Sequence, residues 1–182
     1  MFKRIILAVD LLDIPDRGVD EVIQLAQNYG AEIMFMHVLS FDSEAYPLYS
    51  LYPLFEGYSE VTEKALEDYE ACIQAHEQHC LAQLREFQQR AKAVQVRAQV
   101  LLASGNPGPI LCDQAQAWKA DVVIMGNRGR RGIRELFLGS VSNYVMHHAP
   151  CSVLILRDSA LSTLDQPPPD QSVPQDIPMA MG

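Results

Sequence analysis

Continuous apolar runs recur along the first 157 residues and predict the strands of a sheet. The four clearest runs lie at residues 4–9, 31–38, 121–125 and 151–156. Runs of this kind are typical of strands that are buried on both faces of a parallel sheet. Residues 95–102 alternate before they turn apolar, which predicts a further strand with one partly exposed face.

Segments with helical spacing separate these strands. Apolar residues recur at steps of three and four in segments that begin at Val19, Val61, Ile110 and Ser140. Strands that alternate with helices through short links are typical of α/β folds with right-handed crossovers. The pattern therefore predicts an α/β domain with a five-stranded parallel sheet.

Two segments depart from this rhythm. Residues 41–60 carry six of the chain's 14 aromatic residues among prolines and a glycine, and a connection of this length predicts a lid, a surface for a protein partner or a mobile segment. Residues 158–182 hold five of the 11 prolines and no Lys or Arg, which predicts an acidic flexible tail. We therefore expect one domain over residues 1–157, with an insertion at 41–60, followed by the tail.

Composition and charge narrow the class of protein. Hydrophobic residues make up 48% of the chain and charged residues 20%, as in folded globular proteins. The net charge of −9 argues against bulk electrostatic binding to nucleic acid or to an anionic membrane surface. No apolar run reaches the roughly 18 residues of a membrane span. The four scattered cysteines predict reduced thiols, as in a cytoplasmic protein. From the charge and the apolar runs, we expect neither nucleic-acid nor membrane partners.

The segment between the apolar run at 121–125 and the last predicted helix contains the strongest candidate site. It reads GNRGRRGIRELFLGSVS over residues 126–142. Glycines let N–H groups approach a ligand, and the helix start after Gly139 adds unpaired N–H groups and a partial positive charge. Ser140 and Ser142 add hydroxyl groups. Four of the ten arginines also lie here, which indicates an anion site with phosphate as the favoured anion; they are Arg128, Arg130, Arg131 and Arg134.

The spacing of Gly126, Gly129, Gly139 and Ser140 resembles the ATP-binding branch of the universal stress protein family. The signature of that branch is Gly, two residues, Gly, nine residues, Gly and then Ser or Thr, and these positions match it. The similarity extends over about residues 2–157, apart from the aromatic insertion. It implies a Rossmann-like three-layer sandwich with strand order 3-2-1-4-5, in which a ligand sits at the carboxyl ends of the first and fourth strands.

The resemblance also implies a set of nucleotide contacts. The base would lie against Ala8 and Val9, and the main chain of Val38 would read the adenine edge. Asp10 would touch a ribose hydroxyl or a nucleotide-bound metal ion. The ribose and phosphates would lie along the remaining residues of the set, which are Met125, Gly126, Arg128, Gly129, Gly139, Ser140, Val141 and Ser142.

We expect a stress-response or signalling protein that binds ATP in preference to AMP or ADP, because the arginine cluster exceeds what one phosphate needs. Mg²⁺ would be carried by the phosphates. The residues show no recognisable combination of nucleophile, base and orienting group. Two alternatives stay open: a slow ATPase or phosphotransferase that uses Ser140 or Ser142, and an interaction protein in which the nucleotide is a structural or switching ligand.

The last strand predicts self-association. Its run from Val153 to Leu156 has neither proline nor charge, and in the order 3-2-1-4-5 it is an edge strand. An exposed edge of this kind invites pairing, and a second copy can cover it about a twofold axis. We therefore expect a homodimer through residues 151–157, from Cys151 to Arg157.

Overall fold

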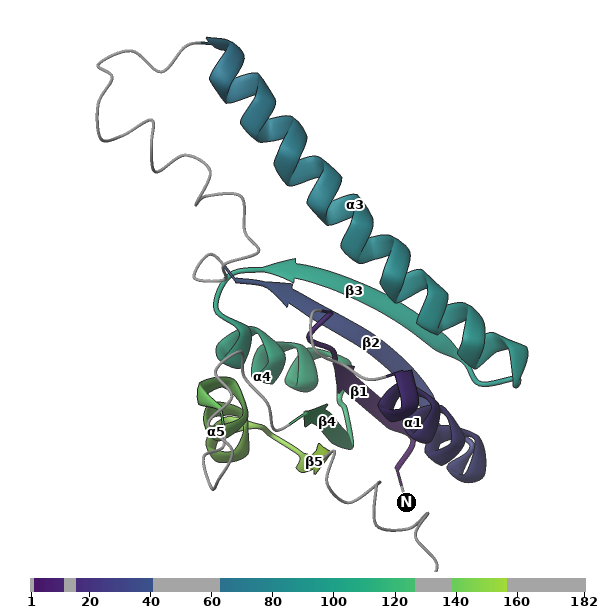
Figure 1. The fold of residues 1–182 in the computed structure, drawn as a ribbon. Helices are drawn as coiled ribbons and strands as arrows, with labels where there is room; N and C mark the ends of the chain where they lie inside the picture. Colours follow the sequence, from purple (N-terminus) through teal and green to yellow (C-terminus); the bar gives the residue numbers. More distant parts are fainter. Residues whose placement is uncertain (1, 12–15, 41–62, 127–138, 157–182) are drawn as a thin grey trace, which may run out of the picture.

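The computed structural model describes residues 2–11, 16–40, 63–126 and 139–156, which form a sheet between layers of helices (Figure 1). The strands are β1 (Arg4–Ala8), β2 (Glu32–Leu39), β3 (Ala98–Ser104), β4 (Val122–Gly126) and β5 (Ser152–Leu156). The helices are α1 (Asp16–Tyr29), α3 (Glu63–Ala93), α4 (Pro107–Trp118) and α5 (Ser140–His148). All strand pairs are parallel and the order is β3-β2-β1-β4-β5, which confirms the predicted fold class.

Each face of the sheet is buried under two helices. On one face, Ile5 belongs to a core with Leu84 of α3 and with residues of α1. On the other face, Ile6 belongs to a core with Leu111 of α4 and Val145 of α5. Successive side chains of a strand point to opposite faces, so neighbours such as Ile5 and Ile6 enter different cores. This two-sided burial explains why the strands are apolar runs without alternation.

The third strand begins later than the alternating pattern predicts. α3 ends at Ala93, and the chain turns through Gln95, whose φ of 64° lies in the left-handed region. The N–H groups of Val94 and Val96 donate to the carbonyl oxygen of Ala91 at 3.2 and 3.0 Å, so these residues complete the helix end. β3 is an edge strand whose residues 98–103 are all half-buried, so both of its faces are partly exposed, whereas the pattern predicted one partly exposed face.

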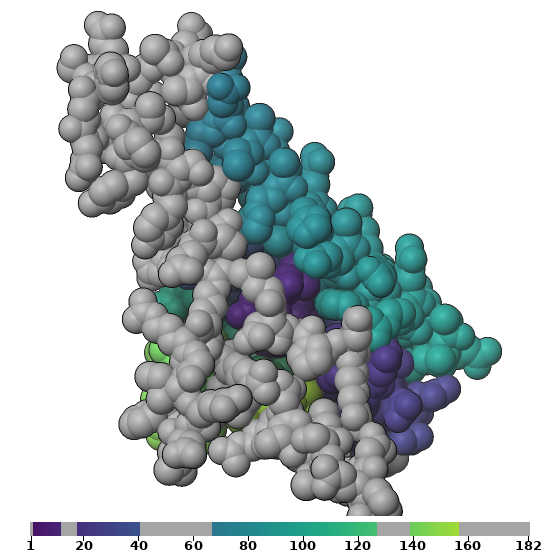
Figure 2. Space-filling model, viewed as in Figure 1, coloured from purple at the N-terminus to yellow at the C-terminus, as the bar shows by residue number. Residues whose placement is uncertain are grey.

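α3 extends past the carboxyl ends of β2 and β3 and forms a ridge on the surface (Figures 1 and 2). Its second half packs on the sheet, where the ring of Phe87 lies 5.9 Å from that of Phe35. Within the described part of the chain, we find no helix with the length and apolar character of a membrane span. The predicted insertion at 41–60 and the predicted tail at 158–182 lie outside the described residues, and so does Arg157.

At the amino ends of the strands, Asp121 joins β4 to β1. Its carboxylate accepts hydrogen bonds from the N–H groups of Lys3 at 2.6 Å and Arg4 at 2.8 Å. These two backbone donors hold the pKa of the Asp121 carboxyl below its ordinary value. The Arg4 guanidinium also donates to the carbonyl oxygen of Trp118, at 2.9 Å. The start of the sheet is therefore fixed by polar contacts at its rim.

Candidate functional site

The carboxyl ends of β1 and β4 lie side by side where the strand order reverses. Ala8 is in register with both Met36 of β2 and Met125 of β4. The residues that follow these three lie along one edge of the sheet, and they include Val9, Asp10, Val38 and Gly126. In open parallel sheets, ligands bind at the carboxyl ends of the strands at such a switch point.

The end of β1 is held against β2 by two hydrogen bonds at Val9. The Val9 N–H donates to the carbonyl oxygen of Met36 at 2.8 Å, and Nδ1 of His37 lies 2.7 Å from the carbonyl oxygen of Val9. A carbonyl oxygen only accepts, so Nδ1 must carry the proton in this contact. The predicted site did not include His37; its only signal was a polar residue inside an apolar strand.

The buried residues at this end of the sheet have their side chains in the core, so only their main chain could contact a ligand. Val9, Val38 and Met125 are buried, the first in the core under α1 and α3 and the others in the core under α4 and α5. Asp10 is half-buried. Gly126 is exposed, and a β-carbon placed on it would meet no atom of the described residues within 4 Å. The described residues therefore leave the space beside Gly126 unfilled.

α5 brings its N-terminus to the same edge. The short link from Ala149 to Cys151 joins the end of α5 to the start of β5, so α5 runs antiparallel to the strands and begins near their carboxyl ends. The Asn143 N–H donates to the carbonyl oxygen of Gly139 at 2.9 Å. The N–H groups of residues 140–142 precede this bond and have no acceptor within the helix.

The two serines of this turn differ in what they can offer. Ser140 is exposed. Ser142 is only 3% exposed, and its hydroxyl donates to the carbonyl oxygen of Gly139 at 3.0 Å. Ser142 therefore stabilises the first turn of α5, and its N–H is the group that faces the helix end. Val141 is half-buried and packs against the core under α4 and α5.

Several predicted site residues fall between β4 and α5, outside the described residues. These are Arg128 and Gly129, together with the other arginines of the cluster, Arg130, Arg131 and Arg134. The structure brings the remaining predicted residues together in two groups. Ala8, Val9, Asp10, Val38, Met125 and Gly126 lie at the ends of adjacent strands, and Gly139, Ser140, Val141 and Ser142 form the start of α5.

The cysteines are free thiols, and three of them are wholly or partly buried. Burial raises the pKa of the Cys80, Cys112 and Cys151 thiols, so these groups are protonated at neutral pH. Across the described ranges, we find no group of three or more His, Cys, Asp or Glu side chains arranged to hold a metal ion.

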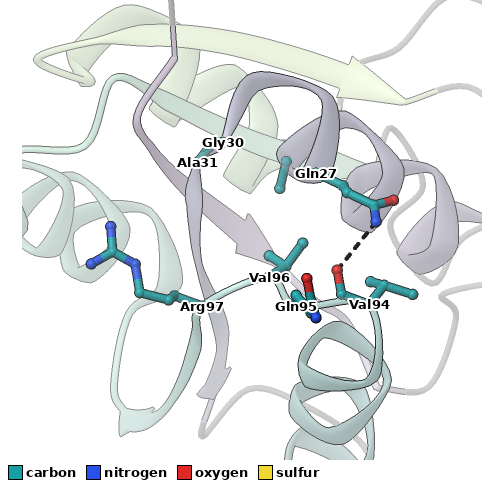
Figure 3. A pocket seen from close by; sticks show the side chains of 8 residues that line it. Gln27, Gly30, Ala31, Val94, Gln95, Val96 and Arg97 are labelled. Carbon is teal, nitrogen blue, oxygen red and sulfur yellow. Dashed lines mark hydrogen bonds between the residues drawn. The ribbon is translucent and has the colours of Figure 1, made fainter.

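A shallow pocket of about 280 Å³ lies at the opposite edge of the sheet, between the end of α1 and the turn from α3 to β3 (Figure 3). Gln27 donates from Nε2 to the carbonyl oxygen of Val94 at 3.2 Å on its wall. Gly30 and Gln95, which also line it, have positive φ and belong to turns. These turns form the pocket at the amino ends of the strands, whereas the switch point lies at their carboxyl ends.

A family model described as the universal stress protein family matches residues 1–157. The chain belongs to the universal stress protein family. A universal stress protein of Synechocystis is 32% identical over 161 residues, which cover 86% of this chain and 98% of the relative. A universal stress protein of Thermus aquaticus is 33% identical over 161 residues, which cover 86% of this chain and 100% of the relative.

Solved universal stress proteins share the fold. The protein UspA from Lactobacillus plantarum superposes with a TM-score of 0.63 at 20% identity, over 86% of this chain and 98% of that one. A universal stress protein in complex with cAMP gives a TM-score of 0.54 at 23% identity, over 86% and 97% of the two chains. A family member from Arabidopsis thaliana with AMP bound gives 0.50 at 17% identity, over 85% and 90%. These likenesses establish a Rossmann-like sandwich for this universal stress protein.

Proposed function

We propose that this universal stress protein binds an adenine nucleotide at the edge formed by β1, β2, β4 and α5, in a stress-response or signalling role. The observation that supports the proposal is that α5 begins at the carboxyl end of the sheet, which is also the end where the switch point lies. The N–H groups and partial positive charge of the α5 N-terminus suit phosphate. The main chain of Val38, on the neighbouring strand, offers a donor and an acceptor to a base.

Two glycines support the proposal because the described structure does not require them. Gly139 has φ −57° and ψ 160°, a conformation that any residue adopts. A β-carbon at Gly126 would meet none of the described residues. The backbone conformation does not demand glycine at Gly139, and packing against the described residues does not demand it at Gly126; a ligand that approaches the main chain closely would explain both. These two positions flank the space where ribose and phosphates would lie.

The bound ligands of structural neighbours favour adenine as the base. One neighbour is in complex with cAMP and another has AMP bound. Both ligands join an adenine to a phosphate, which matches an edge that combines Val38 with the start of α5. Asp10, half-buried directly after β1, would touch a ribose hydroxyl.

We favour ATP as the ligand, with AMP and ADP as weaker ones, because four arginines follow Gly126 in the sequence. Their charge exceeds what a single phosphate would require. Mg²⁺ would enter with the phosphates, and Asp10 is the carboxylate at this edge that would reach it. When bound, the ion would neutralise phosphate charge; the chain itself would supply N–H donors from residues 140–142.

The proposal is tested on the purified full-length chain. Mass spectrometry identifies any nucleotide released on denaturation, and calorimetry on the stripped protein measures binding of AMP, ADP and ATP with and without Mg²⁺. We expect an adenine nucleotide in the released fraction and saturable binding of one molecule per chain. A protein that carries no nucleotide and gives no binding heat with any of the three would overturn the proposal.

We also propose that the chain forms a homodimer through β5. β5 is an edge strand, and Leu154 in its centre is 42% exposed. An apolar side chain on an unpaired edge is a liability that a second copy removes by covering it. Charged residues, which often protect such edges, do not occur within β5.

A further inference from the structure

His37 stands at the point where the ladder between β1 and β2 ends. The Glu32 N–H donates to the carbonyl oxygen of Lys3, and the Val9 N–H donates to the carbonyl oxygen of Met36. These two bonds fix the alternation of the parallel ladder, so the N–H and C=O groups of even-numbered residues of β2 point toward β1. On the other side of β2, the Ile33 N–H donates to the carbonyl oxygen of Arg97, and the Gly105 N–H donates to the carbonyl oxygen of Leu39. The N–H and C=O groups of odd-numbered residues of β2 therefore point toward β3.

By this alternation, the next rung would run from the Val38 N–H to the carbonyl oxygen of Val9. Within the described residues the register ends before that rung, with Ala8 opposite Met36. The donor found at the Val9 carbonyl is the ring of His37, with Nδ1 at 2.7 Å. The side chain of one residue thus stands in for the main chain of the next.

We infer that His37 is a positioning residue that reserves the main chain of Val38 for the ligand. Its ring donates to the Val9 carbonyl where the Val38 N–H would donate, and among the described residues the ladder stops there, with the Val38 N–H and C=O directed toward the end of β1. It also fixes the main chain immediately before Asp10. This inference rests on the proposed nucleotide site and adds to it a residue that makes no ligand contact.

The chemistry of the freed groups specifies the base. An N–H donor beside a C=O acceptor complements adenine, whose N1 accepts and whose N6 amino group donates. Hypoxanthine presents the reverse pattern, with a protonated N1 and a carbonyl oxygen at C6. A site that hydrogen-bonds one pattern leaves its own polar groups unpaired against the other. His37 therefore acts on base selectivity, through Val38.

Two substitutions separate the ring's donor from its bulk. His37→Leu fills similar space without a donor, whereas His37→Asn places an amide N–H where Nδ1 stands. In His37→Leu we expect the missing hydrogen bond between the Val38 N–H and the Val9 carbonyl to form. The Val38 amide of the apo variant should then exchange with solvent about tenfold more slowly than that of the apo wild type. In His37→Asn its exchange stays close to wild type. This measurement needs no ligand, so it tests His37 even if nucleotide binding fails.

Calorimetry with AMP and inosine monophosphate supplies the second readout. We expect His37→Leu to lose about tenfold in AMP affinity, the scale of one hydrogen bond, and to lose most of the preference for AMP over inosine monophosphate. His37→Asn should restore both. Leu102→Val is the control, because Leu102 is the register partner of His37 on β3 and a loss of packing there leaves the Val9 carbonyl untouched.

The possible failures are distinct. If the wild-type chain binds no adenine nucleotide, the proposed function fails. If the wild type binds AMP selectively and His37→Leu keeps the same affinity, selectivity and Val38 exchange rate, the role of His37 is refuted while the site stands. If His37→Leu and Leu102→Val both lose the same affinity for AMP as for inosine monophosphate, His37 only stabilises the fold.

Discussion

The ring of Tyr144 on α5 lies directly against the backbone of Gly108 on α4. A β-carbon on Gly108 would come within 2.7 Å of Cδ1 and 2.9 Å of Cγ of that ring. The ring also stacks on His148, with centroids 4.1 Å apart. The contact sets how closely α5 approaches α4, and thereby where the first turn of α5 lies relative to the sheet.

Gly108→Ala should therefore destabilise the fold, although alanine is the better helix former. The new methyl group collides with the base of the Tyr144 ring, and overpacking of this kind costs about 1–3 kcal/mol. Gly126→Ala is the matched control, because its β-carbon meets none of the described residues and the free energy of unfolding should change by less than about 0.5 kcal/mol. Urea denaturation of both variants checks the contrast. Equal effects would mean that α5 adjusts freely against α4.

Gly139→Val should abolish nucleotide binding while the fold persists. The backbone at Gly139 has φ −57° and ψ 160°, which valine adopts without strain, so the effect falls on the approach of phosphate to the helix start. Thermal unfolding verifies the fold and calorimetry measures binding. Unchanged affinity in the folded variant would remove the start of α5 from the site.

Replacing Arg128 and Arg130 by Ala should weaken ATP binding more than AMP binding. Hydrogen bonds between charged partners contribute roughly 1.5–3 kcal/mol when well made and less when exposed to solvent, and ATP offers more phosphate charge than AMP. The comparison requires affinities of both nucleotides for wild type and double variant. Equal losses would show that these arginines do not select for the longer phosphate chain.

Leu154→Lys should convert a dimer to a monomer. A lysine at the centre of β5 places like charges across the proposed twofold interface and protects the edge from pairing. Val94→Lys is the control: Val94 is 38% exposed in the turn after α3, remote from β5. Sedimentation equilibrium at micromolar concentration reports the mass of each. A wild-type chain that is already a monomer under these conditions contradicts the proposed interface.

The Asp121 carboxyl should make stability depend on pH. Its pKa is lowered from an ordinary value of 3.8 by the N–H groups of Lys3 and Arg4, so its contribution is present above that value and is lost as pH falls through the folded pKa. Asp121→Asn should be less stable than wild type at pH 7, and the difference should shrink toward pH 3. Asp68→Asn, at an exposed position on α3, is the control in urea denaturation at both pH values.

The sheet could be predicted from the sequence because both of its faces are buried, which leaves long apolar runs such as that around Phe35. The start of the last helix at Ser140 was predicted where the structure has it, since Gly139 precedes it. The start of β3 was misplaced because residues 95–97 alternate like a strand. A left-handed residue at Gln95 leaves no signal in composition, and tertiary packing at Val96 decides the turn.

The candidate site was predictable where it depends on glycine spacing, and less so where it depends on register. Gly126 and Gly139 are recognisable in the sequence. The role of His37 is not, because it follows from the pairing of β1 with β2 one residue short of Val38. Likewise, nothing in the sequence indicates that the Ser142 hydroxyl turns inward to Gly139.

The most direct test of the central claim is a titration of the isotope-labelled full chain with AMP, followed residue by residue through amide chemical shifts. We expect the largest shifts at Asp10, Val38, Gly126 and Ser140, which belong to four separate segments of the chain. Residues of the opposite pocket, such as Gln27 and Val94, should not move. Saturable shifts confined to that pocket, or no shifts at the four positions at saturating AMP, would contradict it.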